Sequence, residues 1–405
     1  MQNDNDSLSM LNNESVEFAD LPSEDEVQLE GHGRFREAVL YATDWTTETI
    51  VSQLRRQNII LNPSFQRRDA WRMQQKSRFI ESLILGLPIP QIVLAETKER
   101  RGNFIVLDGK QRLLSILQFW GLGEGKSNNY ALSGLEIRKE LTRKKLSQFE
   151  SDPDLEDDLN ALLNQPIRTV VIKNWPNIDF LHLVFLRLNT GSVKLSPQEL
   201  RQALFPGPFS DWVDEAAVSS NAIKSLLNLR EPDFRMRDIE LLSRYLAFRF
   251  FLGRYRGRMK GFLDYSFATF NEDWAEWEPV LKEAVSEFEL SVNVLLEIFG
   301  DSIAKRPGSK QFNRAIFDFL IFYAQNKELR EEMILNSANV KASFNTIFTD
   351  ASFKSATEKD TAGVPNTFER LYKWGLVLSA AINKDINTPR IVEDEEGLRL
   401  DFPGF

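Results

Sequence analysis

Residues 104–112 read FIVLDGKQR, and the helical pattern LLSILQFW of residues 113–120 follows at once. The apolar run predicts a short buried strand that ends at Asp108, and the spacing of Leu and Ile after Arg112 predicts a helix. Gly109 allows a sharp turn between the two because it has no Cβ. The stretch therefore predicts a strand–turn–helix corner, which belongs to a fold that combines a sheet with helices.

The same corner is a candidate phosphate site. A helix N-terminus presents unpaired backbone N–H groups and the positive end of the helix dipole, which stabilise anions. Lys110 and Arg112 add positive charge there, and Gly109 lets a ligand approach the backbone closely. Because many proteins with sheets and helices have such corners, a purely structural role is the alternative.

Composition excludes several kinds of chemistry. The chain has 405 residues, of which 42% are hydrophobic, and this is enough for two or three folded domains. It has no Cys, which excludes disulfides, thiolate nucleophiles, thiolate-bound zinc and iron–sulfur clusters. His32 and His182 are its two imidazoles, which argues against a His-rich metal site and against a His-Asn-His nuclease in this chain.

The net charge of −9 originates in the N-terminal segment. Residues 1–30 hold nine acidic side chains and no Lys or Arg, so the rest of the chain is electrically balanced. This composition predicts an acidic disordered tail over residues 1–35. The tail would serve either as a solubilising leader or as a shield for a basic groove.

Hydrophobic periodicity divides the remaining residues into two parts. Mixed helix and strand signals predict an α+β domain with a small sheet over residues 36–207, in which the polar stretch 121–165 is expected to be an excursion from the core. Helical periodicity predicts an all-α domain over residues 208–388, followed by an irregular tail over residues 389–405.

Two further polar clusters are candidates for ligand binding. Gln66 and Arg67 lie in a loop before a predicted helix, where a guanidinium suits phosphate oxygens and an amide suits a base or ribose edge. A surface loop anchored by Trp71 is the alternative. Asn189 follows an apolar helix and is explained as its C-cap, but Arg187 lies among Leu and Phe residues and has to reach an edge or an anion.

A run of basic residues interleaved with Phe and Tyr follows in the helical half. Arginine with aromatic residues is typical of nucleic-acid grooves, where cations neutralise phosphates and rings stack on bases. The alternative is that Arg237, Asp238, Glu240 and Arg244 satisfy one another along a helix face. The candidates for DNA contact are Arg237, Arg254, Arg256, Arg258 and Lys260.

The order of the motifs resembles a known family. PSFQRRDAW, ESLILGLPIPQIVL, IVLDGKQRLLSI, FLRLNTGSVKLSPQELR, RDIELLSRYLAF and YRGRMKGFLD follow one another over residues 45–265. This order resembles the N-terminal domain family of GmrSD-type modification-dependent restriction systems, which includes GmrS-like and SspE-like proteins. The resemblance implies a ParB/sulfiredoxin-like fold, nucleotide binding and hydrolysis, and a part in restricting DNA during anti-phage defence.

The resemblance also implies a nucleotide site at the corner. The family motif Asp-Gly-Gln-Gln-Arg stands here as DGKQR, which implies catalytic roles for Asp108, Gln111 and Arg112. Asp108 would orient water or a Mg²⁺ ion. The residues expected to hold the NTP are Gln66, Arg67, Gly109, Lys110, Arg187 and Asn189. Lys110 departs from the family pattern by adding a cation where an amide is common.

The sequence therefore predicts an NTP-binding and NTP-hydrolysing protein that senses DNA or regulates a separate nuclease subunit. Many relatives carry a C-terminal His-Asn-His nuclease domain, for which this chain lacks the histidines. A non-catalytic DNA-binding or adaptor protein with a ParB-like fold is the alternative, and a DNA nickase is the third. No signal peptide or membrane-spanning pattern is found, so a cytoplasmic protein without membrane contact is expected. The base of the NTP and the formation of homo-oligomers stay open.

Overall fold

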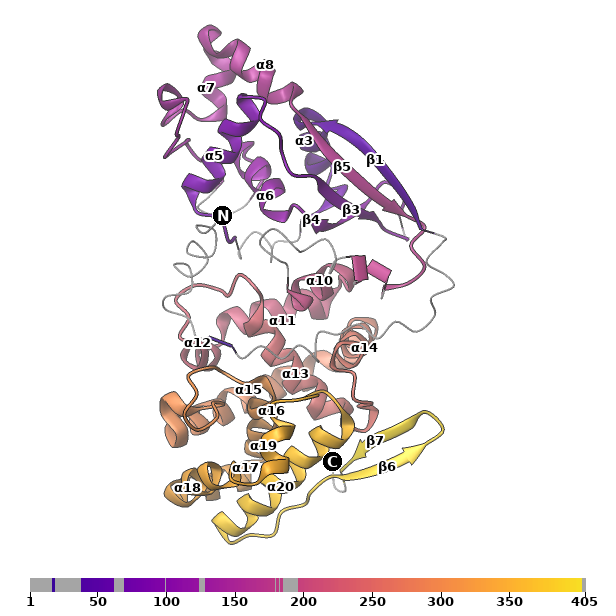
Figure 1. The fold of residues 1–405 in the computed structure, drawn as a ribbon, viewed down its shortest axis with the longest axis vertical. Helices are drawn as coiled ribbons and strands as arrows, with labels where there is room; N and C mark the ends of the chain where they lie inside the picture. The colour runs from indigo at the N-terminus through magenta and orange to yellow at the C-terminus, as the bar shows by residue number, and fades with distance from the viewer. Residues whose placement is uncertain are drawn as a thin grey trace. The chain divides into compact units, whose positions relative to one another are not determined.

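The computed structural model describes residues 17–18, 38–61, 69–98, 100–123, 128–178, 180–181, 183–184 and 196–402. The chain forms two compact units (Figure 1). We call Val27–Leu204 the sheet unit, and Phe205–Phe405 together with Met1–Glu26 the helical unit. The chain is thus of the mixed α+β class, as predicted.

The sheet unit is built on a mixed sheet with the strand order β1-β5-β3-β4-β2 among the described residues. Its strands are β1 (Val39–Thr46), β2 (Ile59–Ile60), β3 (Ile92–Glu96), β4 (Phe104–Asp108) and β5 (Pro166–Lys173). β5 runs antiparallel to β1 and parallel to β3, whereas β4 runs antiparallel to β3 and parallel to β2. The first four residues of β3 and of β4 are all buried, as expected for central strands made of Ile, Val, Leu, Ala and Phe.

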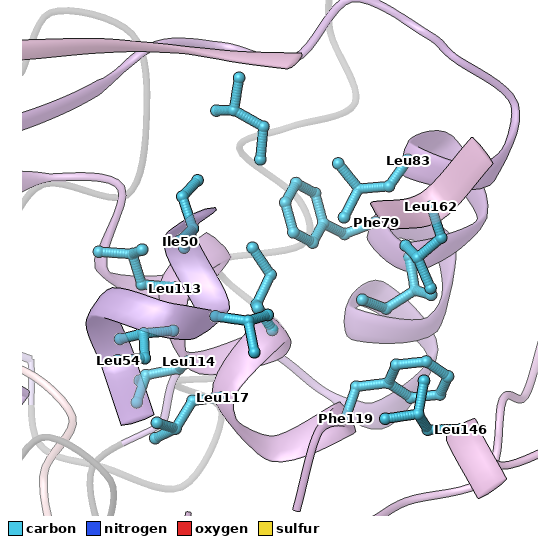
Figure 2. Close-up of a cluster of buried hydrophobic side chains, with 14 of the residues drawn as sticks. Ile50, Leu54, Phe79, Leu83, Leu113, Leu114, Leu117, Phe119, Leu146 and Leu162 are labelled. Carbon is cyan, nitrogen blue, oxygen red and sulfur yellow. The ribbon is translucent and has the colours of Figure 1, made fainter. Parts of the chain in front are cut away.

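Helices pack on this sheet and form the core of the unit. They are α3 (Thr47–Arg55), α5 (Met73–Ile84), α6 (Lys110–Phe119), α7 (Leu146–Ser151), α8 (Glu156–Asn164) and α10 (Pro197–Leu204), with short 3₁₀ turns η2 (Lys139–Leu141) and η3 (Pro153–Leu155). Figure 2 shows how their apolar side chains meet: Ile50 and Leu54 of α3 lie beside leucines of α6, and Leu162 of α8 lies beside Phe79 and Leu83 of α5. α6 is therefore the apolar centre of the unit, and its first turn is held in a fixed place.

Our expectation that residues 121–165 are an excursion from the core was wrong. Leu132, Leu141, Phe149 and Leu162 are at most 1% exposed and belong to the same hydrophobic cluster as α6. Polar residues outnumber apolar ones in this stretch. A short helix can nevertheless pack on the core with only one apolar side chain per turn.

The helical unit is organised around α16. Its helices are α11 (Pro208–Ser219), α12 (Asn221–Leu227), α13 (Arg237–Phe251), α14 (Met259–Glu272), α15 (Trp274–Phe299), α16 (Arg314–Ala324), α17 (Lys327–Leu335), α18 (Ser337–Ile347), α19 (Ala351–Ala356) and α20 (Val364–Ile382), with 3₁₀ turns η4 (Leu252–Arg254) and η5 (Gly300–Ser302). Every residue of α16 after Arg314 is buried, because this helix is apolar on all sides apart from Asp318. Among the described residues, no helix is both long and apolar enough to span a membrane.

The structure tests the prediction for the C-terminal tail but not the one for the N-terminal tail. The predicted irregular tail at 389–405 is instead a β-hairpin of β6 (Arg390–Asp394) and β7 (Gly397–Asp401). Cross-strand ion pairs of Arg390 with Asp401 and of Arg399 with Asp394 support it, and strands this short give a weak sequence signal. The predicted acidic tail at 1–35 lies outside the described residues, except for Glu17 and Phe18.

Candidate functional site

The strand–turn–helix corner forms where the sequence predicted it. β4 ends at Asp108, α6 begins at Lys110, and Gly109 between them is left-handed with φ of 94°. A Cβ at Gly109 would lie 3.0 Å from the side chain of Ile92 and 3.3 Å from that of Arg112, so both backbone conformation and space favour glycine. The first turn of α6 holds no acidic residue, and its N-cap glycine provides no side-chain cap. The positive end of the helix dipole is thus not countered by an acid within that turn.

Asp108 and Arg112 form an ion pair one helical turn apart. Asp108 Oδ2 accepts a hydrogen bond from Arg112 Nη2 at 3.0 Å, and Asp108 Oδ1 accepts one from the backbone N–H of Gly109 at 2.8 Å. The Asp108 side chain is 19% exposed and that of Arg112 is 8% exposed. The pair fixes the guanidinium against the start of α6.

Lys110 is held by a carboxylate from a distant part of the chain. Its Nζ donates to Glu199 Oε1 at 2.6 Å, and both side chains are 4% exposed. Glu199 is fixed in turn by a capping box at the start of α10, where its Oε2 accepts from Ser196 N–H at 2.7 Å and its own N–H donates to Ser196 Oγ at 3.1 Å. A carboxylate that is already oriented therefore neutralises the lysine.

Gln111 holds Trp71, which lies just before α5. Its Oε1 accepts a hydrogen bond from the backbone N–H of Trp71 at 3.2 Å, and the Trp71 ring packs against Phe79 at 5.7 Å between centroids. Trp71 thus packs on α5 and is held by α6, whereas residues 62–68 lie outside the described residues. The other ligand candidates, Gln66, Arg67, Arg187 and Asn189, lie outside the described residues.

Sequence reasoning missed a buried polar network beside the corner. Lys76 of α5 forms an ion pair with Asp69 and donates from Nζ to Gln118 Oε1 at 2.8 Å, while Gln118 Nε2 donates to Asp69 Oδ2 at 3.1 Å. Lys76 lies three residues before Phe79 and so on the buried face of α5, and Gln118 lies within the apolar pattern of α6. Their positions in the apolar patterns could have indicated from the sequence that both side chains are buried. For Glu199, the spacing Ser-x-x-Glu could have indicated a capping box.

The DNA-contact candidates are largely engaged within the protein. Arg237 donates from Nε to Asp233 Oδ2 at 2.9 Å, and Lys260 lies 3.5 Å from Asp264 Oδ2. Arg256 Nη2 donates to Asp394 at 2.8 Å and to Glu396 at 3.1 Å, and the bond to Asp394 raises the pKa of Arg256.

The remaining two candidates, Arg254 and Arg258, are exposed. Arg254 lies over the ring of Tyr265 at 5.5 Å. Three aromatic residues of the same run are core residues: Phe248, Tyr255 and Phe262 are buried and pack on one another at 5.0 to 5.4 Å between centroids. For these three rings, the interleaving with arginine reflects helix packing.

The described residues offer no metal site made by the protein alone. No group of three or more His, Cys, Asp or Glu side chains gathers among them. Mg²⁺ is often held by one or two carboxylates together with substrate phosphates, so Asp108 fits as one ligand of an ion that a nucleotide brings.

The fold and the corner define an α+β domain with a helix start suited to an anion, joined in one chain to a helical unit. Residues 47–206 match the family described as the N-terminal domain of the GmrSD restriction endonuclease. This match supports a GmrSD-type restriction system N-terminal domain over these residues, as the resemblance implied. The match contains the corner and Glu199, and it covers less than half of the chain. Neither a curated protein nor a solved structure matches.

Proposed function

We propose that the sheet unit has a ParB/sulfiredoxin-like fold and binds an NTP at the start of α6. We further propose that it does so as a component of a DNA restriction system. The observation that carries the proposal is the β4–α6 corner: a left-handed Gly109, a first turn without acid or side-chain cap, and Arg112 fixed beside it. Each of these features suits a phosphate group. The family of this domain supports the restriction role.

Arg112 is the side chain that would contact the phosphates. Asp108 accepts a hydrogen bond from Nη2 of Arg112, and a guanidinium has five N–H donors in a fixed fork that matches phosphate oxygens. Asp108 would then orient the guanidinium and provide a carboxylate oxygen for Mg²⁺ or water. Gln111 would act by holding Trp71 through its backbone N–H.

Lys110 takes a different role in this proposal from the one the sequence indicated. Its ammonium is buried and paired with Glu199, so its charge is compensated before any ligand arrives. We assign it to positioning: it ties α6 to α10 and so keeps the helix start in place. Glu199 belongs to the same tie.

The chain would act with other components. Its 405 residues hold two histidines and no cysteine, which argues against a His-Asn-His centre within them, and we propose that a separate nuclease subunit cleaves the DNA. NTP binding or hydrolysis by the sheet unit would regulate that subunit in the cytoplasm.

A second function, nucleotide sensing without turnover, is favoured by the Lys110–Glu199 pair. A lysine that stabilises the charge of the transferring phosphoryl group needs an uncompensated ammonium, and here a buried carboxylate already neutralises it. In that case nucleotide would act as a switch, with release of phosphate absent.

The test measures NTP binding and phosphate release separately. Each of the four NTPs is titrated by calorimetry with Mg²⁺, with and without DNA, and phosphate release is followed in parallel. Asp108→Asn and Arg112→Lys are compared with Arg101→Ala, which removes an exposed arginine in the turn before β4. We expect binding to weaken at least tenfold in the first two variants and to be unchanged in the third.

Binding without phosphate release would support the sensing function. If no NTP binds the wild-type protein, or if Arg112→Lys binds as well as Arg101→Ala while both keep their melting temperature, the nucleotide site is refuted.

A further inference from the structure

Two residues of the acidic N-terminal segment contact residues of the Phe205–Phe405 part of the helical unit. The backbone N–H of Phe312 donates to the carbonyl oxygen of Glu17 at 2.7 Å, and Phe18 forms a parallel β-bridge with Phe312. The two phenylalanine rings lie 4.9 Å apart. Figure 1 draws this short indigo stretch among the helices of the helical unit.

Two arginines complete the contact around the Phe18 ring. The guanidinium carbon of Arg237 lies 4.7 Å from the ring centroid and that of Arg314 lies 4.8 Å from it. Both distances are within the range of a cation–π interaction. We call Phe312, Arg237 and Arg314 the Phe18 cradle.

Carboxylates of the helical unit hold the cradle arginines. Asp233, whose side chain is 2% exposed, accepts from Arg237 Nε, and Arg314 Nε lies 2.9 Å from Glu240 Oε1. A carboxylate takes the N–H edge of a guanidinium and leaves its flat face for an aromatic ring. The cradle is therefore held in place by the helical unit itself.

The segment that provides Phe312 is also preorganised. Asn313 N–H donates to the carbonyl oxygen of Ala304 at 2.8 Å, and Lys305 forms an antiparallel β-bridge with Phe312. This closed loop presents the N–H of Phe312 to an incoming strand, which is how an extended peptide adds to a strand edge.

Opposite charges also favour the acidic N-terminal segment as the occupant of the Phe18 cradle. Residues 305–314 read KRPGSKQFNR, with four basic side chains and no acidic one. Arg306 and Arg314 pair with carboxylates of other segments, and Lys310 is exposed. Residues 1–30, which contain Glu17 and Phe18, have nine acidic side chains and no basic one. Opposite charges around a contact raise the rate and specificity of docking.

We propose that the acidic N-terminal segment docks through Phe18 on the cradle and, while docked, excludes DNA from the basic segment 305–314. The segment is a tethered competitor: it is a polyanion attached to the chain, so its effective concentration at the cradle is high. The choice of DNA as the excluded polyanion rests on the restriction role proposed above. The docking of Phe18 on the cradle does not depend on that role.

Docking is tested in the full-length chain. The protein has no Cys, so Ser15→Cys allows a single fluorophore to be attached three residues before Phe18. We expect the fluorescence anisotropy of this label to fall when Phe18→Ala is added, to be retained with Phe18→Trp, and to be unchanged with Leu11→Ala, which removes an apolar side chain from the same segment.

Exclusion of DNA is tested with unlabelled protein and a fluorescent DNA duplex. We expect Phe18→Ala to bind the duplex about fivefold more tightly or better than wild type at low salt, and Phe18→Trp and Leu11→Ala to bind like wild type. The gain should shrink as salt screens the segment's charge.

Each outcome decides one part of the proposal. An anisotropy that does not respond to Phe18→Ala overturns docking. Docking that is lost without any gain in DNA binding overturns exclusion and leaves the segment as a leader that only docks. NTP binding is measured on the same variants and should not change, so a failure here is distinguishable from a failure of the nucleotide site.

Discussion

The two units bury charged side chains in different ways. In the helical unit, buried arginines join helices: Arg244 of α13 donates from Nε to Asp318 of α16 at 3.0 Å, and Arg330 of α17 donates to Glu287 of α15 at 2.8 Å. In the sheet unit, the buried Lys110–Glu199 pair and the Asp108–Arg112 pair lie at one helix start. Buried basic residues join helices in both units, because Lys110 also connects α6 to α10. The sheet unit differs in that two such pairs meet at one helix start, where we propose that an anion binds.

The largest effect on the free energy of unfolding is expected when a buried ion pair is broken in either unit. Lys110→Met leaves Glu199 buried without its cation, and Arg244→Met does the same to Asp318, so each should lower the free energy of unfolding by about 3 to 5 kcal/mol. The measurement is urea denaturation.

The difference between the units predicts that Lys110→Met and Arg244→Met also differ in NTP binding. At a temperature where both are folded, Lys110→Met should weaken NTP binding and Arg244→Met should not. Combining Lys110→Gln with Glu199→Gln should recover most of the stability lost in Lys110→Met, because no buried charge is then left alone. Equal NTP binding by both single variants would refute the division between the units.

An intermediate effect is expected at Glu81 of α5, which anchors the polar stretch to the core. Burial alone would raise the pKa of its carboxyl, but hydrogen bonds from the backbone N–H groups of Arg138, Glu136 and Ile137, with the charge of Arg78, lower it. Glu81→Gln should reduce stability by about 1 to 3 kcal/mol at pH 7.

The lowered pKa of Glu81 also gives a pH dependence with a definite sign. The stability that this carboxylate provides is present above the unfolded carboxyl's pKa of about 4.3 and is lost as the pH falls through the lower folded value. Denaturation at pH 7 and at pH 3 should therefore differ less in Glu81→Gln than in wild type. An equal difference in both proteins would contradict this role.

The smallest effect is expected from Arg256, which pairs with exposed carboxylates of the β6–β7 hairpin. Arg256→Ala should change the free energy of unfolding by less than about 1 kcal/mol. If the exposed Arg254 and Arg258 are the residues of this run that contact DNA phosphates, alanine at either should lower the slope of DNA affinity against salt by about 1, and Arg256→Ala should leave it unchanged.

Much of the sheet unit could be predicted from local signals. The run FIVLD, Gly109 and the Leu and Ile spacing after it indicated β4, the turn and α6, because each depends on residues close in sequence. The hairpin β6–β7 was not found, since two five-residue strands give little periodicity. The core role of residues 121–165 was missed because scattered leucines are buried only when other helices cover them.

The sequence by itself determined the class of the fold, the existence of the corner at Asp108 and Gly109, and the family of residues 47–206. These depend on local backbone preferences and on the order of short motifs. Tertiary structure alone decided which partners the charged side chains have. Lys110 is neutralised by Glu199, which lies 89 positions further on, and Arg237 faces Phe18, which lies 219 positions earlier in the chain. The reason is physical: the state of a charged group depends on which groups and how much water surround it in space, and spacing along the chain does not fix either.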